Sequence, residues 1–285
     1  MAIAYISAMS DATSIAGLTL DEAWEGFARR DRRLDDRFVV AVRTTGIYCR
    51  PSCAARRPRR ENVEMLADPA AARARGYRAC RRCCPDSVAR DRAAVADATR
   101  LIAAANGAPP PLAALADAVG YAPHHFLRLF KRDTGLTPAA YARALRAAHA
   151  AKQLRGAARV TDAIYAAGYA APSRFYADAA RLGMAPATFA EGGAGVTIRW
   201  SRVDTALGPL LVATTPRGLC HAALGDGPAP GELFPAATLI AGDDAHRRWA
   251  ATLAARAAAE RHDPALPDDA RRLAFLEAVR RAADG

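Results

Sequence analysis

Four cysteines stand in two close pairs in the first third of the chain. Cys49 and Cys53 form a Cys-x3-Cys pair, and after 26 intervening residues Cys80 and Cys83 form a Cys-x2-Cys pair. Two close pairs with a gap of this size are typical of a tetrahedral zinc site, and cysteines in a reducing compartment are not expected to form disulfides. The spacing therefore predicts one Zn²⁺ bound by Cys49, Cys53, Cys80 and Cys83.

The segment around these cysteines is strongly basic. From Arg50 to Arg92 it contains twelve Arg and no Lys against five acidic residues, an excess of seven positive charges out of the +11 of the whole chain. The pI of the sequence is near 9.9. Unevenly placed positive charge favours an anionic partner such as double-stranded DNA, although a charge run alone is as often a solvated surface. Thiolates and a soft cation in such a surface indicate chemistry on nucleic acid.

The residues around the cysteines closely resemble a known family. The run FVVAVRTTGIYCRPSC at 38–53 is followed by RENV at 60–63 and GYRACRRC at 76–83. Over about residues 20–88 these motifs resemble the amino-terminal domain of the Ada methylphosphotriester repair proteins. The resemblance implies that Cys49 is both a zinc ligand and the acceptor of a methyl group from a DNA methylphosphotriester.

Thiolate chemistry gives such a reaction a physical basis. A free cysteine is mostly protonated at neutral pH, whereas a sulfur bound to zinc is held as a thiolate. Four thiolates around one Zn²⁺ carry a net negative charge, which leaves a sulfur electron-rich enough to attack a methyl carbon while a phosphodiester leaves. Because the product is a thioether, we expect a single irreversible turnover. The local resemblance also implies that three side chains contact the DNA: Thr45, Arg56 and Arg82.

Local signals predict the elements that lead to the first cysteine pair. Thr19 and Glu22 have the spacing of a capping box, which predicts a helix to about Arg30. The apolar run at 38–42 predicts a buried strand that continues through a Thr-Thr-Gly turn to Cys49.

The second cysteine pair is expected to follow a short helix. Asp68 and Pro69 predict its start, and Gly76 predicts its end. We therefore expect a zinc-binding methyl-acceptor domain over residues 19–88, preceded by a flexible N-terminus over residues 1–18. Cys84 follows the quartet and has no predicted role.

An internal repeat with an offset of 48 residues follows. Gly120-Tyr121 recurs as Gly168-Tyr169, and a Gly-x-x-Pro motif recurs at the same offset. In each unit a short helix reaches a glycine, turns and meets a second helix, which is the helix-turn-helix arrangement. We expect an all-α double helix-turn-helix domain over residues 89–192. Its predicted helices are 87–106, 112–119, 123–133, 137–154, 162–167 and 172–182.

Two motifs of the first unit, GYAPHHFLRLFK and GLTPAAY, resemble those of the AraC-type regulators. The resemblance to that family covers about residues 95–190. Phe126, Leu129 and Phe130 are expected in the core, which leaves the polar side chains of the second helix for DNA. These are His124, His125, Arg128, Lys131 and Arg132. The second unit departs from the pattern and offers Ser173, Arg174 and Tyr176.

The last third of the chain changes to strand composition. Strands are expected at 196–202 and 210–214, followed by helices at 243–261 and from Asp269. The motifs TIRW at 197–200, LGPLLVA at 207–213 and RGLCHAALG at 217–225 resemble the ribonuclease-like leading subdomain of the alkylguanine methyltransferases, and residues 196–285 are expected to form a truncated version of it. The acceptor motif Pro-Cys-His-Arg does not occur in this sequence, and Cys220 follows Leu219 within a predicted strand. We therefore expect Cys220 to be an ordinary buried thiol and alkylguanine transfer to be absent.

The whole chain is interpreted as an α+β multidomain protein. It combines a small zinc-binding α/β module, the all-α helix-turn-helix domain and a partial ribonuclease-like α/β subdomain. Since no apolar run approaches the ~20 residues of a membrane span, we expect a bacterial cytoplasmic, nucleoid-associated protein. The expected function is a sensor of methylated DNA that then activates transcription together with RNA polymerase. The alternative is an AraC-type transcription factor with a purely structural zinc site.

Overall fold

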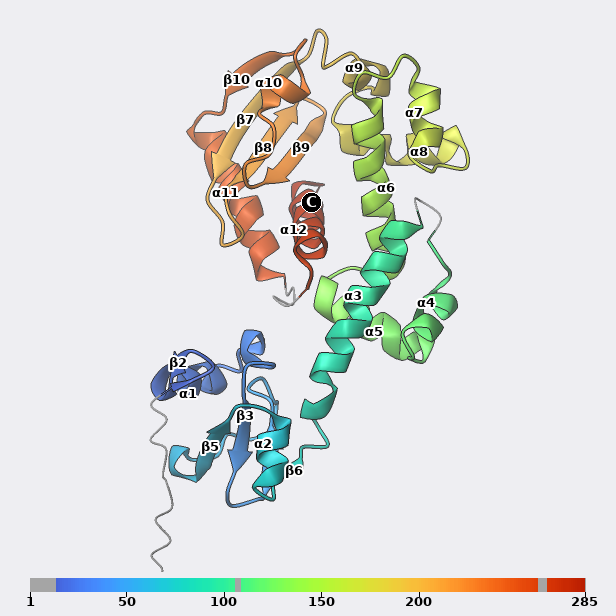
Figure 1. The fold of residues 1–285 in the computed structure, drawn as a ribbon. Coiled ribbons are helices and arrows are strands. Elements are labelled where there is room, and N and C mark those ends of the chain that lie inside the picture. The colour runs from blue at the N-terminus through green and yellow to red at the C-terminus, as the bar shows by residue number, and fades with distance from the viewer. Residues whose placement is uncertain (1–13, 106–108, 261–265, 285) are drawn as a thin grey trace, which may run out of the picture. The chain divides into compact units, whose positions relative to one another are not determined.

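The computed structural model describes residues 14–105, 109–260 and 266–284 (Figure 1). The chain divides into two compact units, with the division between Arg92 and Ala93. Both units combine helices with a four-stranded sheet, so the expected α+β class is confirmed. The limits of the individual domains stay a prediction. Within the described ranges, no helix is long and apolar enough to cross a membrane.

The sheet of the N-terminal unit has the order β5-β3-β4-β6. Strand β3 pairs antiparallel with both β4 and β5, whereas β4 and β6 run parallel. The sequence predicted β3 but not β6, because a two-residue strand carries no periodicity. The strands are β3 (Val39–Val42), β4 (Ile47–Cys49), β5 (Val63–Leu66) and β6 (Arg78–Ala79).

Helices cover this sheet on both faces. Helix α1 (Leu20–Ala28) begins with the expected capping box, in which Thr19 and Glu22 bond each other's backbone N–H groups. It packs Ala23 and Phe27 against Val40, while Val39 and Ala41 point to the opposite face. The elements that complete the unit are the antiparallel pair β1 (Ser14–Ile15) and β2 (Leu18–Thr19), α2 (Pro69–Ala74), and the 3₁₀ turns η1 (Arg32–Leu34), η2 (Arg60–Asn62) and η3 (Pro85–Ser87).

Ser14 to Leu18 fall within the segment that was expected to be a flexible lead-in. The short β1–β2 pair was not expected from the sequence, and it places Ile15 and Leu18 against the core of α1. Residues 1–13 lie outside the described residues.

The repeat of the sequence is a repeat of structure. In both halves a helix ends before a glycine with positive φ, Gly120 at 73° and Gly168 at 83°, and this conformation turns the chain into the next helix. The helices are α3 (Val88–Ala104), α4 (Leu112–Ala118), α5 (Pro123–Thr134), α6 (Pro138–Leu154), α7 (Val160–Ala166), α8 (Pro172–Asp178) and α9 (Pro186–Ala190).

The expected helix at 172–182 is not continuous. Helix α8 ends at Asp178, and the chain tightens into the 3₁₀ turn η4 (Ala179–Leu182) before Gly183. A last turn of 3₁₀ geometry is common where a helix must end at a left-handed glycine, and Gly183 has φ of 62°. The prediction of one helix was therefore wrong in its second half.

The C-terminal sheet has the order β10-β7-β8-β9. Strand β8 pairs antiparallel with both β7 and β9, and β10 pairs parallel with β7. Ala213 and Cys220 share a core with α6 to α9, whereas Leu210 and Val212 share another with α11 and α12. The elements are β7 (Thr197–Val203), β8 (Leu210–Thr215), β9 (Gly218–Leu224), α10 (Pro230–Leu233), β10 (Thr238–Ala241), α11 (Asp244–Ala259) and α12 (Asp268–Asp284).

Candidate metal centre

The parallel pairing of β4 with β6 brings the two cysteine pairs together. In register, Tyr48 lies opposite Ala79, so Cys49 and Cys80 follow at the same end of neighbouring strands. The backbone N–H of Cys80 donates to the carbonyl of Tyr48 at 2.9 Å. A strand of only two residues thus places the second pair beside the first.

The sulfur atoms of the four cysteines form one cluster. All four lie within 4.8 Å of one another, and all four residues are buried. Tight turns deliver the second member of each pair, since the N–H of Cys53 donates to the carbonyl of Arg50 at 3.1 Å. The expected ligand set of Cys49, Cys53, Cys80 and Cys83 is therefore brought together in one place.

The electrostatics of this cluster fit a cation. The Cys49 thiol shares a hydrogen bond with Cys83, which raises the pKa of Cys49 and lowers the pKa of Cys83 to about 6. Burial raises the pKa of Cys53. Four buried thiols of this kind cannot all ionise against one another, whereas a dication of the size and softness of Zn²⁺ would hold them all as thiolates.

A buried carboxylate braces the first cysteine turn. Asp35 accepts hydrogen bonds from the backbone N–H of Ser52 at 2.8 Å and from its hydroxyl at 2.6 Å. The Nε of Arg50 lies 3.6 Å from the same carboxylate. Burial raises the pKa of Asp35. Sequence reasoning missed this residue, because nothing local signals a contact 17 positions away.

A second brace ties β4 to the segment after Cys83. The hydroxyl of Tyr48 donates to the Asp86 carboxylate at 2.6 Å. The Nη1 of Arg73 lies 3.1 Å from both the Tyr48 oxygen and Asp86. Since Asp86 follows the second cysteine pair by three residues, this triad fixes the far side of the cluster.

An open groove of about 590 Å³ runs beside the cluster. Cys49, Cys53 and Cys80 contribute to its lining, and Thr45 and Arg56 lie on it as exposed side chains. Cys83 and Arg82 are not among the lining residues. A molecule in the groove can therefore reach three of the four sulfurs. Two of the three expected DNA contacts, Thr45 and Arg56, line the same groove.

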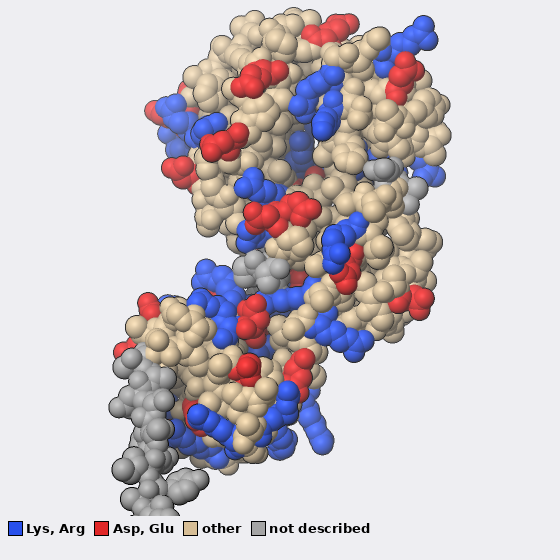
Figure 2. Space-filling view, in the orientation of Figure 1, with Lys and Arg blue, Asp and Glu red and all other residues tan. Residues whose placement is uncertain are grey.

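Arginine dominates the surface around this groove. Lys and Arg side chains gather over the N-terminal unit (Figure 2). The guanidinium of Arg57 stacks 4.0 Å from the ring centre of Phe27 and donates to the carbonyl of Pro51 at 3.3 Å, so it has a packing role as well. Arg56, Arg59 and Arg82 are exposed, and within the described residues none of them forms an ion pair with a buried carboxylate.

The second helix of the first helix-turn-helix separates its faces as expected. Phe126, Leu129 and Phe130 are buried. Arg132 is half-buried and forms an ion pair with Asp133 at 2.5 Å, which reduces its availability to a ligand. The other expected contacts are exposed along α5: His124, His125, Arg128 and Lys131.

The second helix-turn-helix presents a different surface. Ser173, Arg174 and Tyr176 are exposed on α8, and Tyr176 has 56% of its surface free. Phe175 is buried between them in the chain. This face carries one cation and an aromatic ring, whereas the exposed face of α5 carries two cations, Arg128 and Lys131, and two histidines.

The remaining cysteines have no sulfur partner. Cys84 is exposed, adopts a left-handed conformation with φ of 45°, and directs its thiol to the carbonyl of Arg81 at 3.4 Å. Cys220 is buried in β9, and its thiol donates to the carbonyl of Ala213 at 3.2 Å. Burial raises the pKa of Cys220 to about 12, so the expectation of a buried thiol is confirmed.

Two family models match this chain. One is described as the metal binding domain of Ada and matches residues 22–86, and the other is described as a helix-turn-helix domain and matches residues 115–192. The first contains the whole cysteine cluster. The chain belongs to the Ada family. With four sulfurs in place, its metal cofactor is Zn²⁺.

Relatives of known name support this assignment. The chain is 41% identical over 229 residues to the "Bifunctional transcriptional activator/DNA repair enzyme Ada" of Escherichia coli. That alignment covers 77% of this chain and 64% of the relative. It is 41% identical over 210 residues to the "Regulatory protein ada" of Salmonella typhimurium, which covers 72% of this chain and 59% of that protein. The chain thus spans less than two thirds of the length of these curated relatives.

Solved structures align with less than half of the chain. One is described as "Crystal structure of the methylated N-ADA/DNA complex", with 45% identity, 45% of this chain and 97% of that chain covered, and a TM-score of 0.34. Another is described as "NMR structure of E. Coli Ada protein in complex with DNA", with 44% identity, 44% and 90% covered, and a TM-score of 0.37.

Proposed function

We propose that this Ada-family chain senses methylation damage in the DNA backbone. In this proposal Cys49 takes a methyl group from a DNA methylphosphotriester, and the helix-turn-helix region then activates transcription of a response to alkylation. The name of the Escherichia coli relative, which joins transcriptional activation with DNA repair, supports both halves. The observation that carries the proposal is the position of Cys49, in a four-sulfur cluster and on an open groove.

The groove offers what a methylated phosphate needs. Thr45 and Arg56 stand on the same groove as Cys49 and can bond the unmethylated oxygens of the triester and its neighbouring phosphates. A triester has lost the negative charge that would repel a thiolate. A diester keeps that charge, so the same surface favours the damaged over the undamaged phosphate.

The transfer itself needs no proton. The Cys49 sulfur attacks the methyl carbon from the side opposite the oxygen, an S–C bond forms, and the C–O bond breaks with its electron pair going to the phosphodiester. Bound Zn²⁺ supplies the positive charge that keeps the sulfurs ionised at neutral pH. The methyl group cannot leave the product thioether at neutral pH. The protein is therefore a single-turnover acceptor.

Geometry alone leaves a second acceptor in reach. Cys49 and Cys80 are both 9% exposed and both line the groove, whereas Cys83 lies away from it. Cys49 is preferred because its position matches the acceptor of the Ada motif quoted above. Thr45 also precedes it by only four residues, across the turn that ends β3.

Methylation of Cys49 gives the site a signal that DNA can read. A thiolate becomes a neutral thioether, so one negative charge disappears from the surface that faces DNA. With phosphates ~7 Å away and an effective dielectric of ~40 to 80, relief of repulsion with two or three of them is worth roughly 1 to 3 kcal/mol. This corresponds to roughly 5- to 150-fold tighter binding, which is enough to change promoter occupancy.

The helix-turn-helix region is proposed as the reader of the promoter. His124, His125, Arg128 and Lys131 would enter the major groove from α5, and Ser173 and Arg174 would make the weaker contacts from α8. Arg82 is proposed to contact the backbone. Activation further requires contact with RNA polymerase, and the protein is expected with the nucleoid in the bacterial cytoplasm.

Intact-mass measurement tests the transfer. The zinc-loaded protein is incubated with an excess of methylphosphotriester DNA, and with unmethylated DNA of the same sequence as the control. The proposal predicts a gain of one methyl group per chain that stops at one equivalent. A protein that binds the DNA without any gain of mass would instead be a transcription factor with a structural zinc.

A further inference from the structure

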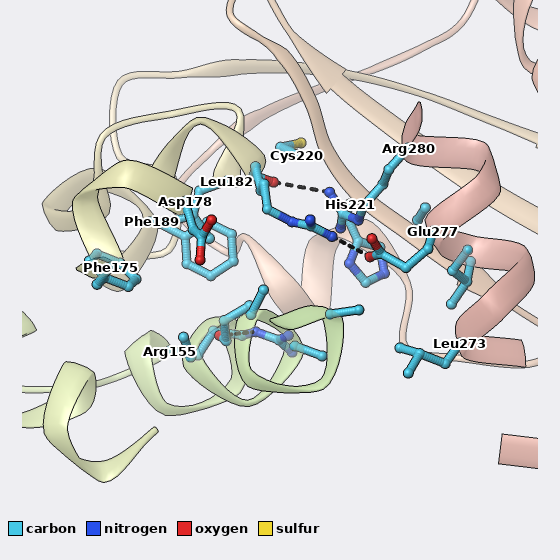
Figure 3. Close-up of a pocket in the computed structure, with 18 of the residues that line it drawn as sticks. Arg155, Phe175, Asp178, Leu182, Phe189, Cys220, His221, Leu273, Glu277 and Arg280 are labelled. Atoms are coloured by element: carbon cyan, nitrogen blue, oxygen red, sulfur yellow. Dashed lines mark hydrogen bonds and ion pairs between the residues drawn. The ribbon is translucent and has the colours of Figure 1, made fainter. Parts of the chain in front are cut away.

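A second hollow lies in the C-terminal unit. It has a volume of about 110 Å³ and is enclosed by the end of α6, by η4, by β9 and by α12 (Figure 3). A single water needs about one tenth of that volume, so the hollow has room for a small molecule. It lies between the second helix-turn-helix and the C-terminal sheet.

Three arginines and two carboxylates line this pocket. Arg181 forms an ion pair with Glu277, which neutralises one cation. Arg155 and Arg280 have no carboxylate within ion-pair distance in the described parts of the chain. Both side chains donate to main-chain oxygens, Arg155 Nε to Ala151 at 3.2 Å and Arg280 Nη1 to Arg181 at 3.0 Å. The lining therefore carries three cations against two carboxylates, and Arg155 and Arg280 form no direct ion pair within the described residues.

Two buried nitrogen atoms of the pocket also lack a hydrogen-bond partner. They are Nε of Arg181 and Nε2 of His221, as far as the described residues go. Burial, reinforced by the charges of Arg155 and Arg280, lowers the pKa of His221 to about 4, so its imidazole is neutral near pH 7. Buried cations and orphaned N–H groups are costly unless an acceptor is supplied.

Most of the remaining wall is apolar; the exception is the Asp178 carboxylate, which accepts a hydrogen bond from the Tyr169 hydroxyl at 3.5 Å. Phe175 and Phe189 stand on one side, and Leu182 and Leu273 on others (Figure 3). Such a wall does not suit a bare hydrated ion, because it leaves part of the ion's surface without a polar partner. It suits a molecule with one anionic end and a compact apolar body.

We propose that this pocket binds a small organic anion, with its charged group between Arg155 and Arg280 and its apolar body against Phe175 and Phe189. The charged group is a carboxylate or a phosphate, and both chemistries satisfy the same donors. A ligand in this place bridges α6 and η4 of the second helix-turn-helix to β9 and α12. The inference holds whether or not Cys49 accepts a methyl group.

Calorimetric titration of the zinc-loaded, full-length protein tests the site. The probes are benzoate, its neutral analogue benzamide, and inorganic phosphate. The variants are Arg155→Met and Arg280→Met, and the matched control is Arg256→Met, which removes an exposed arginine from α11. Circular dichroism checks that each variant is folded. Should Arg280→Met fail to fold, Arg155→Met carries the test, because Arg155 lies at the exit of α6.

The proposal predicts that benzoate binds and benzamide does not. Each pocket variant should weaken benzoate binding by about tenfold or more, since each removes a charged hydrogen-bond donor, and the control variant should leave it unchanged. Equal binding of benzamide would show an apolar cavity with no use for charge. Equal loss in the control would show binding to the general basic surface. Binding of phosphate alone would show a bare anion site, and no binding of any probe a water-filled hollow; each of these results overturns the proposal.

Discussion

Cys49 and Cys220 are both buried thiols on β-strands, yet only Cys49 has the surroundings that make a sulfur reactive. Three other sulfurs lie within 4.8 Å of Cys49, and a groove with Thr45 and Arg56 reaches it. Cys220 has no second sulfur, and burial raises its pKa to about 12. Reactivity here depends on a cation to hold the charge and on a path for the substrate, and burial by itself supplies neither.

Removal of the metal should give the largest difference between the two regions. Cys53→Ala, or a strong chelator, should unfold the N-terminal unit, because metal binding and folding are coupled in so small a module. Cys220→Ala should cost only about 1 to 2 kcal/mol, since it deletes one buried sulfur. Circular dichroism with zinc analysis measures both. Full folding and full zinc content in the Cys53→Ala protein would rule out the ligand set.

Acidification should destabilise the region of Cys220 through its neighbour. The pKa of His221 is about 4 in the fold against an ordinary 6.5. The unfolded chain therefore binds this proton more readily, so the stabilising contribution is complete above pH 6.5 and is lost as the pH falls to about 4. The loss amounts to at most ~3 kcal/mol. Denaturant titrations from pH 7 to 4 should show it in the wild type and not in His221→Gln; the same slope in both would contradict it.

The charge change at Cys49 should appear as a salt signature. Methylated protein should bind promoter DNA roughly 5- to 150-fold more tightly at low salt, and this ratio should shrink as ionic strength rises, because added ions screen the repulsion between thiolate and phosphates. Binding titrations at two salt concentrations measure the ratio. Arg128→Ala is the matched control, since it should weaken both forms about equally. A ratio of one at every salt concentration would exclude the electrostatic switch.

The brace on the first cysteine turn should have the smallest effect. Asp35→Asn keeps the shape of the side chain but removes the charge that attracts Arg50, and it should lower zinc affinity by about tenfold, the low end for groups that orient metal ligands. Competition with a chromogenic chelator gives the affinity. Glu25→Gln is the control, since it removes an exposed carboxylate of α1 in the same unit. Equal affinity of wild type and Asp35→Asn would show that the turn holds without the brace.

The sequence predicted the parts of this site that depend on local spacing. The cysteine pairs, the capping box of α1 and the turn before Cys49 are each set by residues close together in the chain, and the 48-residue repeat is visible because the same short motifs recur. The spacing of the cysteines predicts the metal ligands because each pair lies on one tight turn.

Contacts between distant segments could not be predicted in the same way. The β4–β6 pairing that joins the cysteine pairs, the Asp35 brace, and the arginine-lined pocket around Arg280 all connect residues far apart in sequence. The break after α8 was missed for a different reason, since helix propensity continues through Ala179 and Ala180 while the fold requires the turn at Gly183.

Peptide mapping of all six cysteines in one protein tests the central claim most directly. The zinc-loaded chain is exposed to methylphosphotriester DNA, and in a parallel sample to DNA that carries methylated guanine, and each cysteine peptide is then weighed. The account predicts a methyl group on Cys49 alone in the first sample and on no cysteine in the second, because the thiol of Cys220 is buried and protonated. A methyl group on Cys80, on Cys220, or on no cysteine in the first sample would contradict it.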